Sequence, residues 1–362
     1  MSVSYGGDSI TFADGSVNSS GFIGNRNRII NGAMVVDQRN AGASVTLTSG
    51  GVLTVDRWQG FEDTDGVMTA QQDTSAPTGF VNSLKFTTTT ADATLSAAQF
   101  SLIQQRIEGT NIYDLAWGTA SAATVTLSFW VRSSLTGTFG GALRNSASNR
   151  SYPFTYTISV ADTWEQKTIT IAGDTSGTWL TTTGTGMNVA FGLGVGSTNS
   201  GTAGAWAGST FYSATGATSV IGTLNATFYI TGVQLERGST ASSFEYRSYG
   251  TELALCQRYY EKSYAQGTVP GTITTTNQMQ GIRGNGMFVS RVFFKVTKRA
   301  APGTITIYSS TTGTSGKVNN ANSGSDENSS VNDSGDGGMQ VQGTTGSISD
   351  TYRYQWIADS EL

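Results

Sequence analysis

Short runs that alternate between apolar and polar residues fill most of this chain. TVTLSFWVRS places an apolar side chain at every second position from Val125 to Val131, and WEQKTITIAG alternates in the same way. A period of two is the pattern of a strand with one buried face. Similar runs recur in MNVAFGLGVGS and ATFYITGVQLERG, and clusters of Gly, Ser and Asn separate them. Repeated strands with glycine-rich turns and no intervening helices predict an all-β fold, an antiparallel sandwich.

One segment fits two structures. In SLIQQRIEGTNIYDLAWG, Leu102, Ile103, Arg106 and Ile107 follow helical spacing. The β-rich surroundings make a strand followed by a loop equally plausible. The pattern leaves both structures open.

The sustained helical pattern comes late, at TELALCQRYYEKSY. Leu253, Cys256 and Tyr260 recur at spacings of three and four, and Tyr259 lies on the adjoining stripe. A helix of about twelve residues is marginal in isolation, so its apolar face should pack on a domain or on copies of itself. We therefore predict a connecting helix over residues 248–264, with these four side chains as candidates for oligomer or domain packing.

The start of this helix and its cysteine also carry predictions. Thr251 is the expected N-cap, with Glu252 in the first turn. Cys256 is interpreted as a small buried hydrophobe rather than a reactive thiol, because the chain has no histidine to activate it. As the single cysteine it has no partner for an intrachain disulfide.

The flanking regions complete the expected organisation. DSITFADGSVNSS places two small alternating runs around Asp14-Gly15, which predicts a hairpin too small to fold alone. After the helix come two strands around Pro302-Gly303, a long polar stretch and a terminal alternating strand, YRYQWIADSEL. The predicted divisions are an N-terminal arm (1–24), a sandwich domain (25–247), the connecting helix (248–264) and a smaller C-terminal β domain (265–362).

Composition limits the classes of partner that the chain is expected to bind. Hydrophobic residues make up 37% of the 362 residues, which is enough for a real core, while charged residues make up 13%. So low a charge indicates a surface for neutral polar partners or for self-contact. The net charge of −4 gives no reason to expect nucleic acid, and no stretch approaches the ~18 consecutive apolar residues of a membrane span.

Several segments together carry a resemblance. They are NRNRIINGAMVVDQRNAGAS, LSFWVRSSLTGTF, TWEQKTITIAGDTSGTW, FYITGVQLERGSTASSFEYRSYGTELALCQRYYEKS and the terminal IADSEL. This set resembles the virion fibre or receptor-binding proteins of tailed bacteriophages, over nearly the whole chain from Asn25. The resemblance implies a jelly-roll domain similar to carbohydrate-binding modules, a helical connection to a C-terminal β domain, and a homotrimer.

Few residues in the sequence support a catalytic site. Without histidine, a Ser-His-Asp triad, a Cys-His pair and the usual catalytic zinc site are excluded. The carboxylates Glu62, Asp63 and Asp65, or Glu108 with Asp114, are the remaining route to a glycosidase, but solvated turns are the better interpretation. The chain is expected not to be an enzyme.

No cofactor is expected. A structural calcium ion is the lesser alternative, because jelly rolls of the resembled kind often carry one. Asp326, Glu327, Asp333 and Asp336 offer oxygen ligands, but their spacing does not match an EF-hand loop. A solvated loop is therefore the better interpretation of this segment.

Aromatic side chains are the candidate glycan-binding residues, because their faces stack on pyranose rings. The loop GSTNSGTAGAWAGSTFYSATGATS presents Trp206, Phe211 and Tyr212 among small residues, and Trp179 is a further candidate. For Trp206, core or subunit packing weighs as much as ligand contact.

The expected function is that of a phage virion structural protein, a tail fibre that contributes to host adsorption by binding a host surface glycan noncovalently. The arm of residues 1–24 would attach it to other virion proteins. The alternatives are a head fibre or decoration protein with a purely structural role and, more weakly, a polysaccharide depolymerase.

Overall fold

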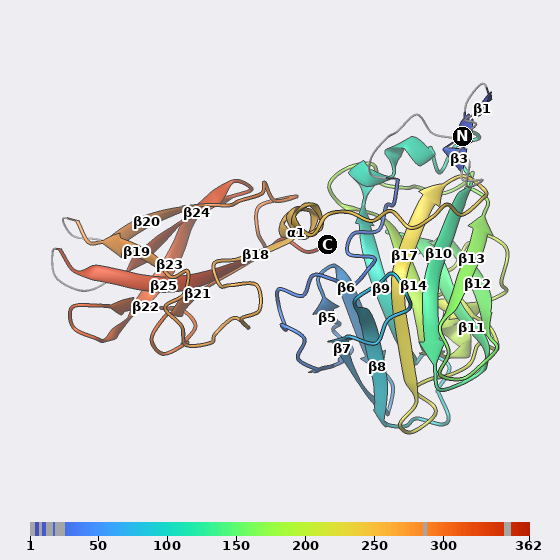
Figure 1. The fold of residues 1–362 in the computed structure, drawn as a ribbon, viewed down its shortest axis with the longest axis horizontal. Helices are drawn as coiled ribbons and strands as arrows, with labels where there is room; N and C mark the ends of the chain where they lie inside the picture. The colour runs from blue at the N-terminus through green and yellow to red at the C-terminus, as the bar shows by residue number, and fades with distance from the viewer. Residues whose placement is uncertain (1–3, 7–8, 12–16, 19–25, 285–287, 344–348) are drawn as a thin grey trace. The chain divides into compact units, whose positions relative to one another are not determined.

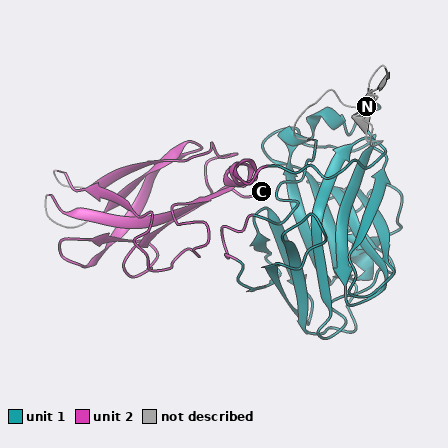
Figure 2. Ribbon diagram, in the orientation of Figure 1, with its two compact units in different colours: residues 1–35, 42–247 teal, residues 36–41, 248–362 magenta. Residues whose placement is uncertain are grey.

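The chain folds into two compact units. One is formed by residues 1–35 and 42–247, and the other by residues 36–41 and 248–362 (Figure 2). The structure, a computed structural model, describes residues 4–6, 9–11, 17–18, 26–284, 288–343 and 349–362.

The first unit is a sandwich of two six-stranded sheets, in which neighbouring strands are antiparallel (Figure 1). In spatial order, sheet I comprises β13 (Glu165–Ile171), β10 (Val125–Ser133), β17 (Thr227–Arg237), β8 (Ser83–Thr90), β7 (Val67–Asp73) and β4 (Val45–Thr46). Sheet II comprises β12 (Ser151–Ile158), β11 (Gly137–Asn145), β14 (Thr185–Val195), β9 (Phe100–Glu108), β6 (Trp58–Asp63) and β5 (Val52–Val55).

The chain crosses repeatedly from one sheet to the other, for example from β8 to β9, from β9 to β10 and from β10 to β11. Such crossing in a double-sheet antiparallel sandwich defines a jelly roll. The predicted fold class is confirmed. The smaller elements of this unit are η1 (Gly109–Asn111), η2 (Tyr113–Leu115), η3 (Ser197–Asn199), and the two-stranded parallel pair β15 (Ser200–Gly201) and β16 (Ser213–Ala214).

Aromatic rings from both sheets meet in the core. Phe129 of β10 lies edge-on to Phe191 of β14, with ring centroids 5.0 Å apart. The ring centroid of Phe139 of β11 lies 6.0 Å from that of Phe228 of β17, with the two rings tilted. In sheet I this follows from the alternation in TVTLSFWVRS, because the four alternating apolar residues from Val125 to Val131 all point into this core.

The segment that fitted two structures forms a strand. Residues of SLIQQRIEG belong to β9, and the 3₁₀ turns η1 and η2 follow it. Ile103 and Ile107 are buried in the core, whereas Leu102, Gln104 and Arg106 alternate with them on the other face. Pairing with β6 and β14 on either side overrides the weak helical spacing.

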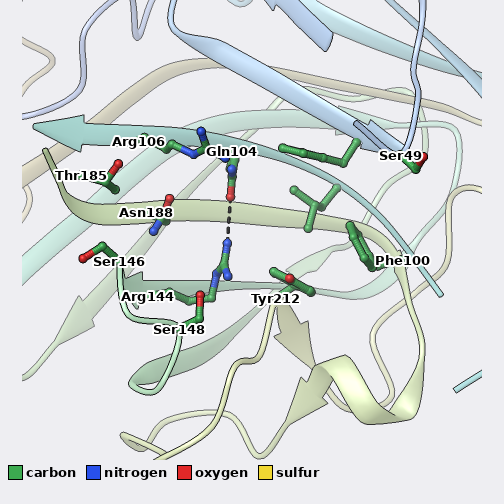
Figure 3. A pocket seen from close by; sticks show the side chains of 12 residues that line it. Ser49, Phe100, Gln104, Arg106, Arg144, Ser146, Ser148, Thr185, Asn188 and Tyr212 are labelled. Carbon is green, nitrogen blue, oxygen red and sulfur yellow. Dashed lines mark hydrogen bonds between the residues drawn. The ribbon is translucent and has the colours of Figure 1, made fainter. Parts of the chain in front are cut away.

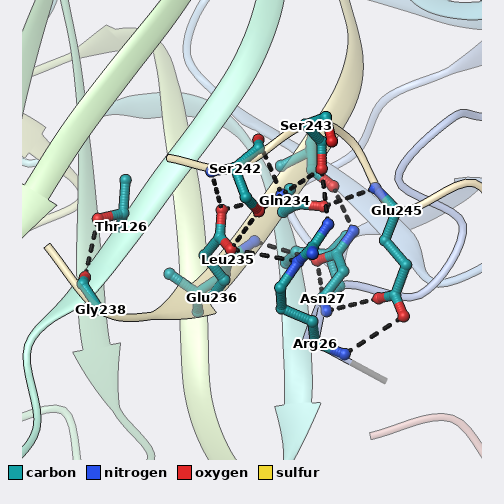
Figure 4. A network of polar contacts seen from close by, with 12 residues as sticks. Arg26, Asn27, Thr126, Gln234, Leu235, Glu236, Gly238, Ser242, Ser243 and Glu245 are labelled. Carbon is teal, nitrogen blue, oxygen red and sulfur yellow. Dashed lines mark hydrogen bonds and ion pairs between the residues drawn. The ribbon is translucent and has the colours of Figure 1, made fainter. Parts of the chain in front are cut away.

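A polar network joins two segments that are distant in the chain (Figure 4). Arg26 lies 3.3 Å from a carboxylate oxygen of Glu236, and the backbone N–H of Asn27 donates a 2.7 Å hydrogen bond to Glu245. The side chain of Asn27 also accepts from the Leu235 N–H at 3.0 Å. These residues belong to the NRNR and VQLERGSTASSFEYR segments, so the network gives those sequences a structural role.

The second unit is built around one long strand. β25 (Thr351–Asp359) pairs with β18, β19, β21 and β22, and Tyr352, Tyr354 and Trp356 are buried in its core. The main sheet has the order β18-β25-β22-β23-β24-β20. The remaining bounds are β18 (Tyr260–Lys262), β19 (Met279–Ile282), β20 (Phe288–Phe293), β21 (Thr304–Ser309), β22 (Lys317–Asn320), β23 (Asp326–Gly335) and β24 (Gly338–Gly343).

The long polar stretch of this unit is not a solvated loop, so that interpretation was wrong. β22 and β23 pair, and β23 pairs in turn with β24. The carboxylate of Asp326 accepts hydrogen bonds from Ser309 (2.6 Å) and from Thr312. Backbone pairing with neighbouring strands, which a polarity pattern does not report, decided the structure.

The connecting helix is shorter than predicted. α1 spans Tyr249–Gln257, and Ser248 is its N-cap rather than Thr251, whose backbone N–H donates to the Ser248 hydroxyl at 3.4 Å. The predicted continuation to residue 264 was wrong because Tyr260 begins β18, which pairs with β25.

Of the four residues predicted to pack on a domain or on another copy, two lie on α1 and two lie beyond its C-terminal end. Cys256 is buried on α1, and Tyr259 and Tyr260 are buried beyond it. Leu253 is half-buried on α1.

Residues 36–41 lie with the second unit, although the predicted division placed them in the first. The side chain of Gln38 donates a 3.0 Å hydrogen bond to the Tyr260 carbonyl. The guanidinium carbon of Arg39 lies 3.8 Å from the centroid of the Tyr260 ring, and Nη2 is 2.9 Å from a carboxylate oxygen of Asp359. Contacts between residues so far apart in the chain cannot be recognised from the local pattern of the sequence.

In the N-terminal arm, β1 (Ser4–Gly6), β2 (Ser9–Thr11) and β3 (Val17–Asn18) form a small antiparallel sheet. The turn predicted at Asp14-Gly15 lies outside the described residues. Among the helices that the structure describes, none has the length and apolar character needed to cross a membrane.

Candidate ligand-binding cleft

A cleft of about 320 Å³ opens on the face of sheet II that points away from the core (Figure 3). Strand β9 supplies its floor, because the residues of β9 that do not enter the core all share this face. The residues that line the cleft are Ser49, Phe61, Phe100, Leu102, Gln104, Arg106, Arg144, Ser146, Ser148, Thr185, Asn188 and Tyr212.

Three polar side chains form a row across adjacent strands. Arg144 of β11 is directly opposite Asn188 of β14, and Asn188 is directly opposite Arg106 of β9. Side chains at such positions on one face of a sheet are neighbours. The cleft therefore presents one amide between two guanidinium groups.

Arg144 is held from two sides. Its Nη2 donates a 2.9 Å hydrogen bond to Oε1 of Gln104, and its guanidinium carbon lies 4.2 Å from the centroid of the Tyr212 ring (Figure 3). The residue is only 6% exposed. Burial lowers the pKa of Arg144 to about 10, an effect that the nearby Arg106 increases and Tyr212 opposes. At neutral pH the group still carries its positive charge.

Aromatic rings form one wall. Phe100 and Tyr212 lie with ring centroids 4.8 Å apart, and both are half-buried. The backbone N–H of Tyr212 donates a 2.8 Å bond to the Asn199 carbonyl, which anchors the loop that carries the ring. Aromatic faces beside fixed amide and guanidinium groups are the combination that binds a polar ring compound.

Of the four aromatic residues predicted from sequence, Tyr212 lines the cleft. Phe211, its neighbour, packs over Gly201, where a Cβ atom would lie 2.3 Å from the ring. Trp179 is only 6% exposed, and its indole N–H is 3.3 Å from Asp174, so its ring is a core component with little face left for a ligand.

Trp206 belongs to a cluster of tryptophans. Its ring centroid lies 5.3 Å from that of Trp117 and 5.5 Å from that of Trp179, both edge-on. Its indole N–H donates a 2.8 Å hydrogen bond to the Ala172 carbonyl. The structure thus separates Trp206 from Tyr212, although both come from one loop.

Sequence reasoning did not identify Gln104, Arg106, Arg144 and Asn188. The one available signal was the alternation in FSLIQQRIE, which puts Gln104 and Arg106 on the face opposite Ile103. Nothing local to Arg144 indicates that β11 and β9 flank β14.

The predicted carboxylate pairs are not among the residues that line the cleft. Glu62 is buried, and burial raises the pKa of its carboxyl group, with help from Asp92 and Asp63. Asp114 lies 2.6 Å from a guanidinium nitrogen of Arg28.

Comparisons with known proteins add little to what the order of the strands already shows about the fold. No family profile and no curated protein matches the chain. Among solved structures, it is similar to a putative sugar-binding protein from Bacteroides thetaiotaomicron (13% identity, TM-score 0.32, 59% of this chain and 100% of that one). A family 11 carbohydrate-binding module from Clostridium thermocellum, in complex with a mixed-linked tetrasaccharide, matches at 10% identity and a TM-score of 0.29, over 56% and 98%.

The enzymatically active domain of a tailspike protein from bacteriophage CBA120 matches at 12% identity and a TM-score of 0.30. This match covers 59% of the present chain and only 22% of the tailspike chain. TM-scores of this size carry no weight for function.

Proposed function

We propose that the first unit binds a glycan noncovalently in the cleft of sheet II, within a phage virion protein that contributes to host adsorption. The observation that carries the proposal is the row of Arg144, Asn188 and Arg106 beside the ring of Tyr212. These groups address hydroxyl groups and one face of a sugar ring at the same time. A cleft of about 320 Å³ is at the lower end of the range for ligand sites, so it accepts a short stretch of a glycan.

Binding without hydrolysis fits the cleft wall. The lining residues that the structure describes include no Asp and no Glu. Glycoside hydrolysis normally needs two carboxyl groups that flank the scissile bond. Recognition of the sugar is therefore the role that these residues support.

The experiment is a glycan-binding measurement on purified protein, with a microbial glycan array and with host cells. Tyr212→Ala should reduce binding, because it removes the ring that walls the cleft. Tyr113→Ala is the matched control, since Tyr113 is an exposed tyrosine of the same unit that does not line the cleft. Equal binding by both variants would remove the cleft as the site, and no binding to any glycan or cell would overturn the function.

The virion setting is part of this proposal and rests on the resemblance of the sequence. We propose a homotrimer that residues 1–24 attach to other virion proteins. Deletion of those residues should leave the soluble oligomer intact and abolish incorporation into particles. Incorporation of the shortened chain at the normal level would contradict the attachment role.

A further inference from the structure

The charges that line the cleft are all of one sign. Among its described lining residues, Arg106 and Arg144 are the charged ones, and both are positive. The chain as a whole carries a net charge of −4. The positive character of the cleft is thus a local property of sheet II rather than a consequence of composition.

Other arginines of the same unit are paired with carboxylates. Arg150 lies 2.6 Å from Asp174, Arg28 lies 2.6 Å from Asp114, and Arg132 lies 3.3 Å from Asp162. Arginine in this unit is therefore commonly neutralised by an acid close to it.

Arg144 differs from these residues. Its guanidinium group contacts the neutral Gln104 and Tyr212, and the described residues that line the cleft around it include no carboxylate. Burying a guanidinium group without a counter-charge costs free energy. A buried guanidinium group without a counter-charge is therefore a favourable site for an anionic group of a ligand.

The positions of the two arginines suit one ligand group. Arg144 and Arg106 flank Asn188 in the same cross-strand row, one strand apart on either side. A guanidinium group presents its N–H groups as a planar fork that matches the two oxygens of a carboxylate or sulfate. A neutral sugar would leave the fork of Arg144 without a charged acceptor.

We infer that the glycan bound in the cleft is acidic and that its carboxylate or sulfate group lies between Arg106 and Arg144, beside Asn188. This inference rests on the proposed function, because it names the class of glycan for the same cleft. The ring of Tyr212 packs against the sugar that carries the anionic group.

The test compares pairs of glycans that differ in charge alone. Oligogalacturonate is titrated against its methyl ester for the carboxylate, and dextran sulfate against dextran for the sulfate, by calorimetry at fixed ionic strength. We expect at least one acidic member to bind about tenfold or more tightly than its neutral partner. Binding should weaken as salt is added, because charge interactions are screened.

Variants assign the preference to residues. Arg144→Gln and, separately, Arg106→Gln should bring the affinity for the acidic member close to that for the neutral one. Arg132→Gln is the matched control, since Arg132 also lies over a tyrosine ring but on sheet I. It should retain the preference. Melting temperatures measured in parallel identify any variant that has lost its fold, and the Arg106 and Arg144 variants serve as independent checks.

The outcomes separate the two proposals. Binding of neutral members as tightly as acidic ones, with both variants unchanged, leaves the glycan-binding function standing and overturns the acidic class. An acidic preference that survives in both folded variants also overturns the inference, because the charge would then be recognised elsewhere. Binding to no member of the panel counts against the proposed function and this inference together.

Discussion

Arg144 lies with its guanidinium carbon 4.2 Å from the centroid of the Tyr212 ring, and these two residues come from β11 and from the loop between β15 and β16. The ring and the side-chain carbonyl of Gln104, rather than a carboxylate, hold the charge in place. A cation–π contact orients the arginine without neutralising it. The charge therefore stays available to a ligand.

Removing this charge should not destabilise the protein. Arg144→Met replaces a desolvated cation by an apolar chain of similar length, so we expect an unchanged or raised melting temperature together with the loss of acidic-glycan binding. Arg150→Met is the contrasting variant, because it leaves the buried Asp174 without its partner and should cost about 2–4 kcal/mol. Thermal unfolding of both variants checks this. A larger loss for Arg144→Met than for Arg150→Met would contradict the interpretation.

Substitutions of Trp206 and Tyr212 should affect different properties: protein stability for Trp206 and glycan binding for Tyr212. Trp206→Ala removes a ring that packs on Trp117 and Trp179, and we expect a loss of about 3 kcal/mol. Tyr212→Ala should change stability little and reduce glycan binding. Chemical denaturation and a binding titration on each single variant measure the two effects. If Trp206→Ala is as stable as the wild type and fails to bind, Trp206 contacts the ligand directly.

The second unit contains an ion pair whose two side chains are fully buried. Nζ of Lys298 lies 2.6 Å from a carboxylate oxygen of Glu261, and it also donates to the Gln257 carbonyl. Lys298→Met leaves the carboxylate buried without a cation and should cost about 3–5 kcal/mol. Adding Glu261→Gln should recover part of this loss, because the uncompensated charge disappears. Calorimetric scans of the single and double variants provide the measurement, and a purely additive double variant would argue against the coupling.

The buried carboxyl group of Glu62 should make the stability of the folded protein depend on pH. Burial raises the pKa of its carboxyl group above the usual 4.5, so the folded chain binds this proton more tightly than the unfolded chain. The resulting stabilisation is fully present below pH 4.5 and is lost as pH rises through the folded pKa. Glu62→Gln, which does not titrate, should therefore gain stability relative to wild type over that window and keep the gain at neutral pH. Melting temperatures from pH 3.5 to 8 test this, with Asp65→Asn, at an exposed acid that is not among the causes of the Glu62 shift, as the control for the change in net charge.

Oligomerisation can be tested on α1. Leu253 is half-buried, so Leu253→Asp should cost little within one chain but disrupt packing between copies through this helix. We expect monomer in place of the proposed trimer in light scattering. Leu224→Asp, at a leucine of the first unit that is 57% exposed, is the matched control and should leave the trimer intact. A trimer that survives Leu253→Asp would place the interface elsewhere.

The sequence by itself determined the fold class, because alternation with a period of two reports directly which side of a strand is buried. It also indicated where the helix α1 lies, since Leu253 and Cys256 fall on helical spacing in a chain of strands. Its boundary at residue 264 was wrong because the pairing of Tyr260 with β25 competes with helix formation, and that competition is not local.

The candidate site was decided by tertiary structure. Tyr212 was accessible to sequence reasoning, because an aromatic residue in a glycine-rich loop is conspicuous. Arg144, Asn188 and Arg106 become neighbours only when β11, β14 and β9 assemble in that order. The sequence determines which face each side chain occupies on its own strand, but the order of the strands depends on packing across the whole sandwich, and that order decides which charges meet.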